Sequence, residues 1–459
     1  MWTACDIMYF FRHIVWAYAS LGSAYHSTCA VFADDLAQRK LDIYPAQQLE
    51  HLVWALEALG TEHHPELCKR LAQLVVQKTY SDALKTLILL QEKAQAANIP
   101  KQDLIALMAS LESNFHTLEP MYQSNILHCY AKLRNFFQRL RIDPRPLFEE
   151  AAEVMSSTCL AEFNSQDLAK TGWAFATLGF RHQGLLDRMT ADILARDLST
   201  FLPQELVNLV WAFATLGFKH DIIFHRVADE VMTRDLNSFE PRGVTNLIWS
   251  FATIGIGSKE HEKQLFKYIS QNVIYQDLAL YKPQEIANLL WAFATMDLRD
   301  ETMFQHIARE LITRDLSTFK PQEISNTIWS FGRLNIINNR MFASMAVEIA
   351  SRDLATFQNQ SLSNITWSYA KVGVIHDEMF ARLSPEMLLR SFQPHQVANV
   401  SWAYATLGIR HEQLGAHLQA EVDSWEGDGS GGLATQESSE LNWALGMLNF
   451  NSKGHITST

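Results

Sequence analysis

The chain has 459 residues, of which 48% are hydrophobic, 19% are charged and 11% are aromatic, with only 19 Gly and 12 Pro. This composition excludes a disordered, collagen-like or linker-dominated chain and provides ample material for a buried core. The formal net charge of −12 argues against tight non-specific binding to nucleic acid or to an anionic membrane. Any nucleic-acid surface must therefore be local.

The cysteines and the apolar segments exclude two further classes of protein. The five cysteines are odd in number, widely spaced and without a CxxC pair, so we expect free thiols rather than disulfides or a metal site. No apolar run approaches the roughly 18 residues that span a bilayer. The first residues, MWTACDIMYFFRHIVWAYASLG, show neither a signal peptide nor an Arg/Ser-rich presequence. We expect the chain to begin inside a structural unit. The cysteines are Cys5, Cys29, Cys68, Cys129 and Cys159.

Tryptophan marks an internal repeat along the chain. Ten of the twelve Trp recur at a spacing that is most often 38 residues, and a fixed period of this length is typical of a solenoid. His128 takes the Trp place in a more degenerate unit, giving roughly eleven or twelve units in all. The repeated residues are Trp16, Trp54, Trp173, Trp211, Trp249, Trp291, Trp329, Trp367, Trp402 and Trp443.

The sequence of each repeat predicts two helices, and the pattern is clearest in residues 196–233. Pro203 suits the first turn of the first helix and Gly217 its end. Both helices carry apolar stripes at steps of three and four. We expect an all-α protein with mostly helix and no sheet, a right-handed α-solenoid of stacked two-helix repeats of about 38 residues with largely buried Trp side chains. The expected organisation is degenerate repeats over 1–160, regular repeats over 161–423, and a Gly-rich insertion with a capping repeat over 424–459.

The position nine residues after Trp exchanges His with Ser, Asp and Asn, which is the set that caps helix N-termini. We therefore predict capping rather than metal binding or catalysis, expect no cofactor and no metal, and expect replacement of His220 by Asn to be nearly neutral. The residues concerned are His63, His182, His220, Ser258, Asp300, Asn338, His376 and His411.

Asn recurs three residues before Trp, although Asn is unfavourable inside a helix. Two interpretations stay open: a ladder of amide hydrogen bonds that ties neighbouring helices together, or a row of donors and acceptors that faces a polymer. The repeated residues are Asn125, Asn208, Asn246, Asn288, Asn326, Asn364 and Asn399.

The residue four after Trp follows the Asn along the same side of the helix and varies between repeats. It suits unit-specific contacts to RNA bases; Arg333 and Lys371 suit phosphate, and a solvated face is equally compatible. For Trp itself we favour a place in the core over base stacking. The variable residues are Thr177, Thr215, Thr253, Thr295, Arg333, Lys371 and Thr406.

An Arg-Asp pair recurs where the second helix ends. A cation at this place favours the helix dipole, so we predict a structural role. The pairs are Arg196/Asp197, Arg234/Asp235, Arg314/Asp315 and Arg352/Asp353.

The string NLVWAFATLG at Asn208 to Gly217, preceded by F-x-P-Q-E and repeated in variants up to NVSWAYATLG at Asn399 to Gly408, resembles the repeats of octotricopeptide and heptatricopeptide proteins. It is also similar to the helical repeats of the FAST-kinase-like family. The resemblance implies an α-solenoid acting on organellar RNA in its stability, processing, translation or ribosomal-RNA maturation, in a mitochondrion or chloroplast. Its implied partner is single-stranded organellar mRNA or rRNA, with protein partners besides, but no membrane and no small-molecule substrate.

Many members of these families end in a nuclease-like RAP domain, which we do not expect here because only sixteen residues follow Trp443. The chain also has no Gly-rich phosphate loop, HExxH or GxSxG motif, so we expect no enzyme. The alternative to RNA binding is a protein-interaction scaffold like armadillo proteins. Those present Trp and Asn four residues apart, whereas here Thr, Arg or Lys stands four residues after Trp, although the acidic net charge favours this alternative.

Overall fold

The computed structural model describes residues 101–255 and 260–427 and seven isolated positions, which are Leu41, Leu49, Leu67, Arg70, Leu71, Leu74 and Gly446. The described residues contain 18 α-helices, short 3₁₀ turns and no strand, so the all-helical solenoid is confirmed. None of these helices combines the length and the apolar character needed to cross a membrane. The handedness and the domain boundaries remain predictions.

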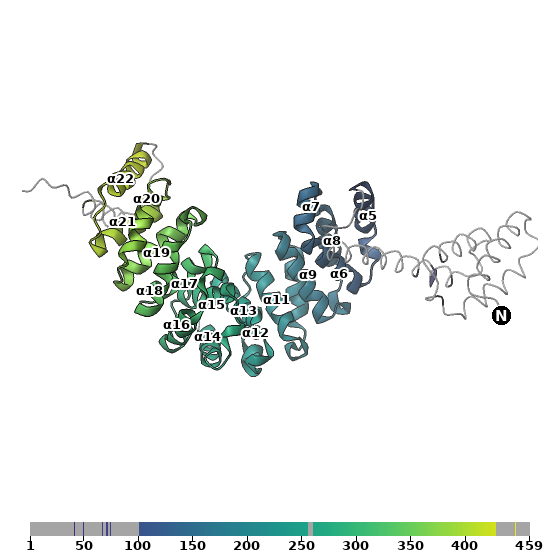
Figure 1. The fold of residues 1–459 in the computed structure, drawn as a ribbon. Helices are drawn as coiled ribbons and strands as arrows, with labels where there is room; N and C mark the ends of the chain where they lie inside the picture. The colour runs from purple at the N-terminus through teal and green to yellow at the C-terminus, as the bar shows by residue number, and fades with distance from the viewer. Residues whose placement is uncertain are drawn as a thin grey trace, which may run out of the picture. The chain divides into compact units, whose positions relative to one another are not determined.

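The chain divides into two compact units, Met1–Arg196 and Asp197–Thr459. In the first unit, α6 packs against α9, while α8 packs against both α5 and α10 (Figure 1). The rings of Phe148 and Phe175 lie edge to face with their centroids 4.9 Å apart, which joins α8 to α9. The described helices of this unit are α5 (Lys101–Ser113), α6 (Pro120–Lys132), α7 (Arg134–Leu140), α8 (Arg145–Ser157), α9 (Ser165–Leu178) and α10 (Gln183–Leu194).

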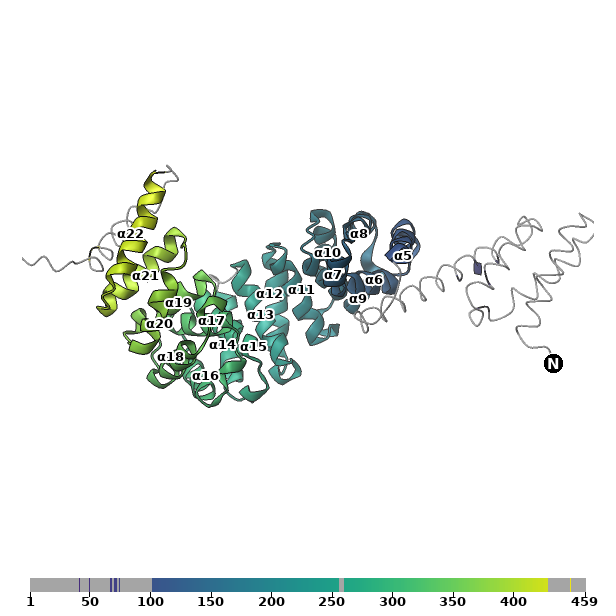
Figure 2. The same cartoon turned by 45° about the horizontal axis from the view of Figure 1, so that its top comes forward.

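The described part of the second unit contains six consecutive helix pairs, which follow one another in chain order in both views (Figures 1 and 2). First helices pack against first helices and second helices against second helices, and the first helices approach each other more closely. The first helices are α11 (Pro203–Thr215), α13 (Pro241–Ile254), α15 (Pro283–Thr295), α17 (Pro321–Arg333), α19 (Asn359–Val372) and α21 (Pro394–Leu407). The second helices are α12 (Asp221–Thr233), α14 (Glu260–Val273), α16 (Glu301–Thr313), α18 (Asn339–Ser351), α20 (Asp377–Met387) and α22 (Glu412–Gly427).

The Pro-Gln-Glu sequence explains where several first helices begin. Pro203 takes the first helical position, where its missing amide hydrogen costs nothing. Two residues later, the Glu205 carboxylate accepts a hydrogen bond from the Leu202 backbone amide at 2.8 Å. Glu285 and Glu323 make the same 2.8 Å bond in α15 and α17. Each carboxylate thus satisfies a backbone amide that the helix itself leaves unpaired.

An aromatic chain forms the core between successive repeats. Phe224 of α12 meets Phe251 of α13 edge to face with the ring centroids 5.0 Å apart, and Phe304 of α16 meets Phe331 of α17 in the same way at 5.0 Å. The aromatic residue two positions after Trp is fully buried in every described repeat of this unit. These residues are Phe213, Phe251, Phe293, Phe331, Tyr369 and Tyr404.

The repeated Trp side chains are mostly buried, as expected, but they lie at the edge of the core rather than at its centre. In the described repeats none is exposed and none is fully buried, because the Phe or Tyr two residues later fills the centre of the core. Small buried residues beside Trp, such as Ala212 and Ser250, bring neighbouring first helices close together and leave the Trp ring at their open side. The half-buried residues are Trp173, Trp211, Trp249, Trp291, Trp329, Trp367 and Trp402.

The predicted N-caps are confirmed in five repeats and wrong in one. The Nδ1 atoms of His182, His376 and His411 accept a backbone amide at 3.2, 3.3 and 3.1 Å. Asp300 and Asn338 accept the equivalent amide at 3.0 Å. His220 makes no cap bond, and its buried Nδ1 has no hydrogen-bond partner in the described structure. The remaining two positions, His63 and Ser258, lie outside the described residues.

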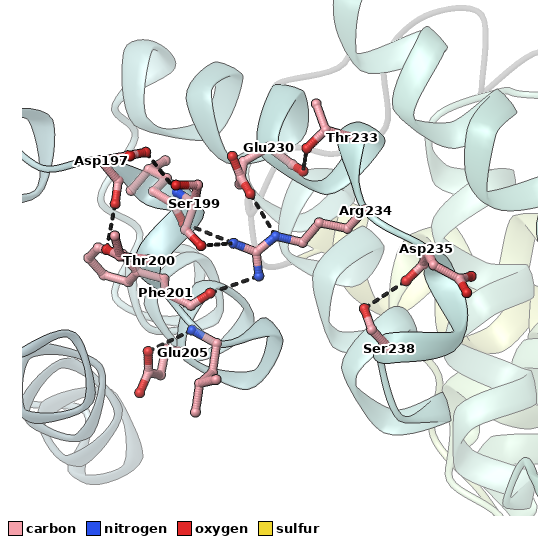
Figure 3. Close-up of polar contacts among 12 residues, drawn as sticks. Asp197, Ser199, Thr200, Phe201, Glu205, Glu230, Thr233, Arg234, Asp235 and Ser238 are labelled. Carbon is pink, nitrogen blue, oxygen red and sulfur yellow. Dashed lines mark hydrogen bonds and ion pairs between the residues drawn. The ribbon is translucent and has the colours of Figure 1, made fainter.

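The Arg-Asp pair is structural, as predicted, and it acts between repeats. The Arg234 guanidinium bonds Glu230 at 2.6 Å and donates to the carbonyls of Phe201 and Leu198 in the preceding turn at 2.7 and 2.9 Å (Figure 3). Asp235 then caps the next turn by accepting the Asn237 amide at 2.9 Å. We call this set of bonds from one arginine the arginine clamp. Equivalent clamps are made by Arg314, Arg352 and Arg390.

Candidate nucleic-acid interface

Four side chains form a line along the solvent-accessible side of each first helix, which we call its open side. In α11 these are Gln204, Asn208, Trp211 and Thr215, which follow at steps of four, three and four and therefore lie on one side of the helix. All four are exposed or half-buried, whereas Val207 in the flanking row is fully buried. This line, which we call the open-side stripe, is the part of the first helix that solvent reaches.

The same four positions recur in the other first helices of the second unit. Each is again exposed or half-buried, with Asn and Trp half-buried throughout. The stripes are Arg242, Asn246, Trp249 and Thr253 in α13; Gln284, Asn288, Trp291 and Thr295 in α15; Gln322, Asn326, Trp329 and Arg333 in α17; Gln360, Asn364, Trp367 and Lys371 in α19; and His395, Asn399, Trp402 and Thr406 in α21.

The open-side stripes of the second unit contain no carboxylate, although the whole chain carries a net charge of −12. They hold three permanent cations, Arg242, Arg333 and Lys371. The six first helices have three acidic side chains, and all three are the buried cap residues described above. The six second helices have fifteen acidic and six basic side chains. Negative charge is thus concentrated away from the stripes.

Close packing of the first helices brings the stripes of neighbouring repeats together. At Gly332 a methyl group would lie only 2.8 Å from the Ser368 Cβ, so α17 and α19 are in backbone contact there. At the next interface the rings of Trp367 and Trp402 lie with their centroids 6.4 Å apart and their planes 37° from parallel. The indole rings of these two neighbouring repeats therefore lie next to each other.

The asparagines do not form a continuous ladder between helices. Asn208 and Asn364 each accept a bond within their own helix, from Gln204 at 2.7 Å and from Gln360 at 2.8 Å. The side chains of the other four asparagines in these stripes make no hydrogen bond within the described residues. These are Asn246, Asn288, Asn326 and Asn399. Their amide groups remain available to a ligand, and among the repeated asparagines that the structure describes only Asn125 bonds a neighbouring first helix through its side chain.

In the first unit the corresponding line is also basic. Asn125 of α6 accepts from Lys170 Nζ of α9 at 2.8 Å, and Lys170 takes the place of the Asn before Trp173. His128 stands in the Trp place of α6, with its ring centroid 4.7 Å from that of Trp173. Burial, followed by the charges of Lys132 and Lys170, lowers the pKa of His128 from 6.5 to about 4. This imidazole is therefore neutral at physiological pH.

The structure brings the predicted variable residues to the open side. Thr215, Thr253, Thr295 and Thr406 are exposed, and so are Arg333 and Lys371; Thr177 in the first unit is half-buried. The Arg333 guanidinium is 49% exposed and lies 3.8 Å from an Asp297 oxygen, a distance that leaves it free to bind another anion. No group of three or more His, Cys, Asp and Glu side chains in the described residues could hold a metal ion.

Sequence reasoning missed one member of the stripe. Trp was placed in the core between repeats, and its ring does pack there, but the helical pattern did not show that part of it also reaches the stripe. The residue four before Asn, such as Gln204 or Arg242, was read only as part of the helix start. Its recurrence at that step from Asn was the signal that would have found it.

Comparison with known families places the second unit in context. Residues 197–424 match the family model described as RNA-editing substrate-binding complex 6 protein. This range is similar to a helical-repeat family associated with RNA, and the match does not single out octotricopeptide or FAST-kinase-like proteins. No curated protein matches the chain.

Proposed function

We propose that the chain is a non-catalytic RNA-binding α-solenoid that holds single-stranded RNA along the open-side stripes of its first helices. The observation that carries this proposal is the absence of carboxylates from 24 stripe positions of a chain with a net charge of −12. Aromatic faces that stack with bases, amides that bond base edges and cations that bind phosphate are the elements of single-strand recognition.

Each kind of residue in the stripes supplies a different part of the binding energy. The half-buried Trp rings provide stacking with little base preference, and the Asn amides and the variable residue provide selectivity. Arg333 and Lys371 bind phosphate. The acidic second helices repel RNA from the rest of this unit, so affinity for random RNA is weak and selectivity arises where several repeats meet their preferred bases together.

The proposed biological role is the processing of organellar RNA, with mRNA or rRNA as the substrate. Support comes from the match to a family named for an RNA-editing substrate-binding complex and from the sequence resemblance to organellar repeat families. The same name supports protein partners within a complex. We propose a mitochondrial rather than a chloroplast location. The finer proposal of an octotricopeptide-like or FAST-kinase-like protein rests on the sequence resemblance alone.

The salt dependence of RNA binding tests the proposed surface. The target RNA is first identified by cross-linking RNA to the wild-type chain and sequencing it. The double variant Arg333→Ala/Lys371→Ala should bind this RNA more weakly, with the slope of log K against log salt reduced by roughly 0.7 per lost phosphate contact. The matched control Arg309→Ala/Arg340→Ala removes two exposed cations from second helices and should leave the slope unchanged. Equal slopes for both pairs would remove the stripes from consideration as the RNA surface.

A second arm separates RNA binding from protein scaffolding. The variant Asn288→Ala/Asn326→Ala removes two amides that make no hydrogen bond in the described structure, so the melting temperature should change little while RNA affinity falls. A fall in melting temperature with unchanged affinity would return the asparagines to a structural role. No detectable RNA binding at low salt by the wild-type chain would favour the armadillo-like protein scaffold.

A further inference from the structure

A chain of hydrogen bonds fixes the orientation of the Asn364 amide. The Gln393 backbone amide donates to Gln396 Oε1 at 3.1 Å, and Gln396 Nε2 donates to Gln360 Oε1 at 3.0 Å. Gln360 Nε2 then donates to Asn364 Oδ1 at 2.8 Å. A backbone amide is only a donor, so it determines which end of Gln396 faces it, and each following amide is oriented in turn.

His395 strengthens the middle of this chain. Its Nε2 lies 2.9 Å from Gln360 Oε1, so this oxygen has two nitrogen neighbours and Gln360 has only its amino group left to offer Asn364. Gln396 is buried, with 7% of its surface exposed, whereas Gln360 and Asn364 are half-buried. We call Gln396, Gln360 and Asn364 the amide relay.

The relay leaves the Nδ2 donor as the unengaged group of the Asn364 amide. Its Oδ1 already accepts from Gln360, while its Nδ2 makes no hydrogen bond within the described residues. The half-buried Trp367 lies three residues further along the same stripe. A base stacked near Trp367 would therefore meet Nδ2 as a free donor, whereas one of the two acceptor positions of Oδ1 is already used.

The three Pro-Gln-Glu helices of this unit cannot form such a relay. Glu205, Glu285 and Glu323 stand where α21 has Gln396, and an ionised carboxylate has no hydrogen to donate. In α11, the residue of the following first helix that corresponds to Gln396 is Gly243. It has no side chain to orient Gln204, so either end of Asn208 can face the ligand. Among the described first helices, the orientation of an Asn side chain by such a relay is found at the α19–α21 interface alone.

We propose that Asn364 reads the exocyclic group of a base through its Nδ2 donor and selects a keto base, uracil or guanine, over the amino bases adenine and cytosine. The proposal rests on the proposed function, because it requires RNA to lie along the stripes. The O4 atom of uracil or the O6 atom of guanine accepts the Nδ2 hydrogen bond, whereas the N4 amino group of cytosine or the N6 amino group of adenine would place a donor against a donor. A correct pair at this contact discriminates by roughly tenfold or more in affinity.

The test is selection of bound sequences from a randomised single-stranded RNA pool, followed by affinity measurements on the selected RNA with each base at the preferred position. Wild-type protein should enrich keto bases at one position. Gln396→Glu keeps an acceptor for the Gln393 amide, as Glu does in three other repeats, but it cannot donate to Gln360. This variant should lose the roughly tenfold keto preference with little change in melting temperature.

Two further variants make the result specific. Glu285→Gln is the reverse exchange at an equivalent cap, but the facing stripe residue is Arg242 rather than Gln, so the preference should be unaltered. Asn364→Asp keeps one oxygen for Gln360 and turns the other toward the base, so the preference should change to adenine or cytosine. RNA binding without a keto preference, or a preference that survives Gln396→Glu, would overturn the amide relay and leave the proposed function standing. Absence of RNA binding would overturn both.

Discussion

The repeat that ends at Arg352 and the repeat that ends at Gln276 pack the same apolar core but join their neighbours differently. Arg352 donates to the carbonyls of Phe319 and Leu316 at 2.6 and 2.7 Å and pairs with Glu348 at 2.6 Å. Gln276 instead contacts Asn237 at 3.5 Å and the Tyr281 hydroxyl. The arginine clamp engages backbone, whereas Gln276 engages side chains.

This difference shows that the apolar repeat pattern does not determine which polar bonds join neighbouring repeats. The aromatic pairs at the two interfaces are alike, with the ring centroids of Phe224 and Phe251 5.0 Å apart and those of Phe304 and Phe331 5.0 Å apart. Stability in a solenoid is close to a sum of repeat and nearest-neighbour terms. At the α12–α14 interface the clamp is absent from the described structure, and a different polar contact is present instead, with His225 Nε2 of α12 2.5 Å from a Glu262 oxygen of α14.

Breaking a clamp should give the largest effect. Arg352→Ala leaves Glu348 and the carbonyls of Phe319 and Leu316 without their partner in a place where the Arg side chain is only 15% exposed. We expect a loss of about 2–4 kcal/mol in the free energy of unfolding, measured by urea denaturation of the full chain.

Arg340→Ala is the matched control, because Arg340 is exposed at the start of the same helix, α18. It should change the free energy of unfolding by less than about 0.5 kcal/mol. Similar losses for the two variants would show that the clamp adds nothing beyond an exposed arginine.

A second departure from the repeat pattern, His128 in place of Trp, makes the first unit sensitive to acid. The folded state lowers the pKa of His128 from 6.5 to about 4, so it favours the neutral ring. The stabilising contribution is complete above pH 6.5 and is lost as the pH falls from 6.5 to about 4. His128→Trp restores the repeat residue and should remove this part of the pH dependence, as followed by thermal unfolding across that range. An unchanged pH profile would assign the acid sensitivity to other groups.

Adding the missing clamp should stabilise the repeat that ends at Gln276. Gln276→Arg with Asn272→Glu reproduces the i,i+4 pair seen in Arg352 and Glu348. We expect a gain of about 1 kcal/mol in the free energy of unfolding and slower amide exchange in α14. Asn272→Glu alone is the control, since it adds the carboxylate without the guanidinium. A gain in the control equal to that in the double variant would mean that no clamp had formed.

The helices could be predicted from sequence because their signals are local. Pro203, Glu205 and Gly217 act within one helix, and five of the six described caps follow from the residue type alone. The partners of the clamp could not be predicted, because Arg234 reaches carbonyls 33 and 36 residues away. The exposure of Trp and the amide relay also depend on the approach of neighbouring helices. The stripe residues Asn, Trp and Thr were found from their spacing, whereas the Gln was not, and the partial exposure of Trp was not predicted.

The smallest effect concerns the one described cap that fails. In His182, His376 and His411 the ring nitrogen accepts the amide three residues later, whereas the His220 ring stacks on Phe218 with the centroids 6.1 Å apart and the planes at 22°. His220→Asn should provide the acceptor that Asn338 provides at 3.0 Å and so stabilise α12 by about 0.5–1 kcal/mol. His376→Asn exchanges one working cap for another and should be nearly neutral. Urea unfolding of both variants, with amide exchange at Ile223, measures the difference. A neutral His220→Asn would show that the stacked ring already contributes as much as a cap bond.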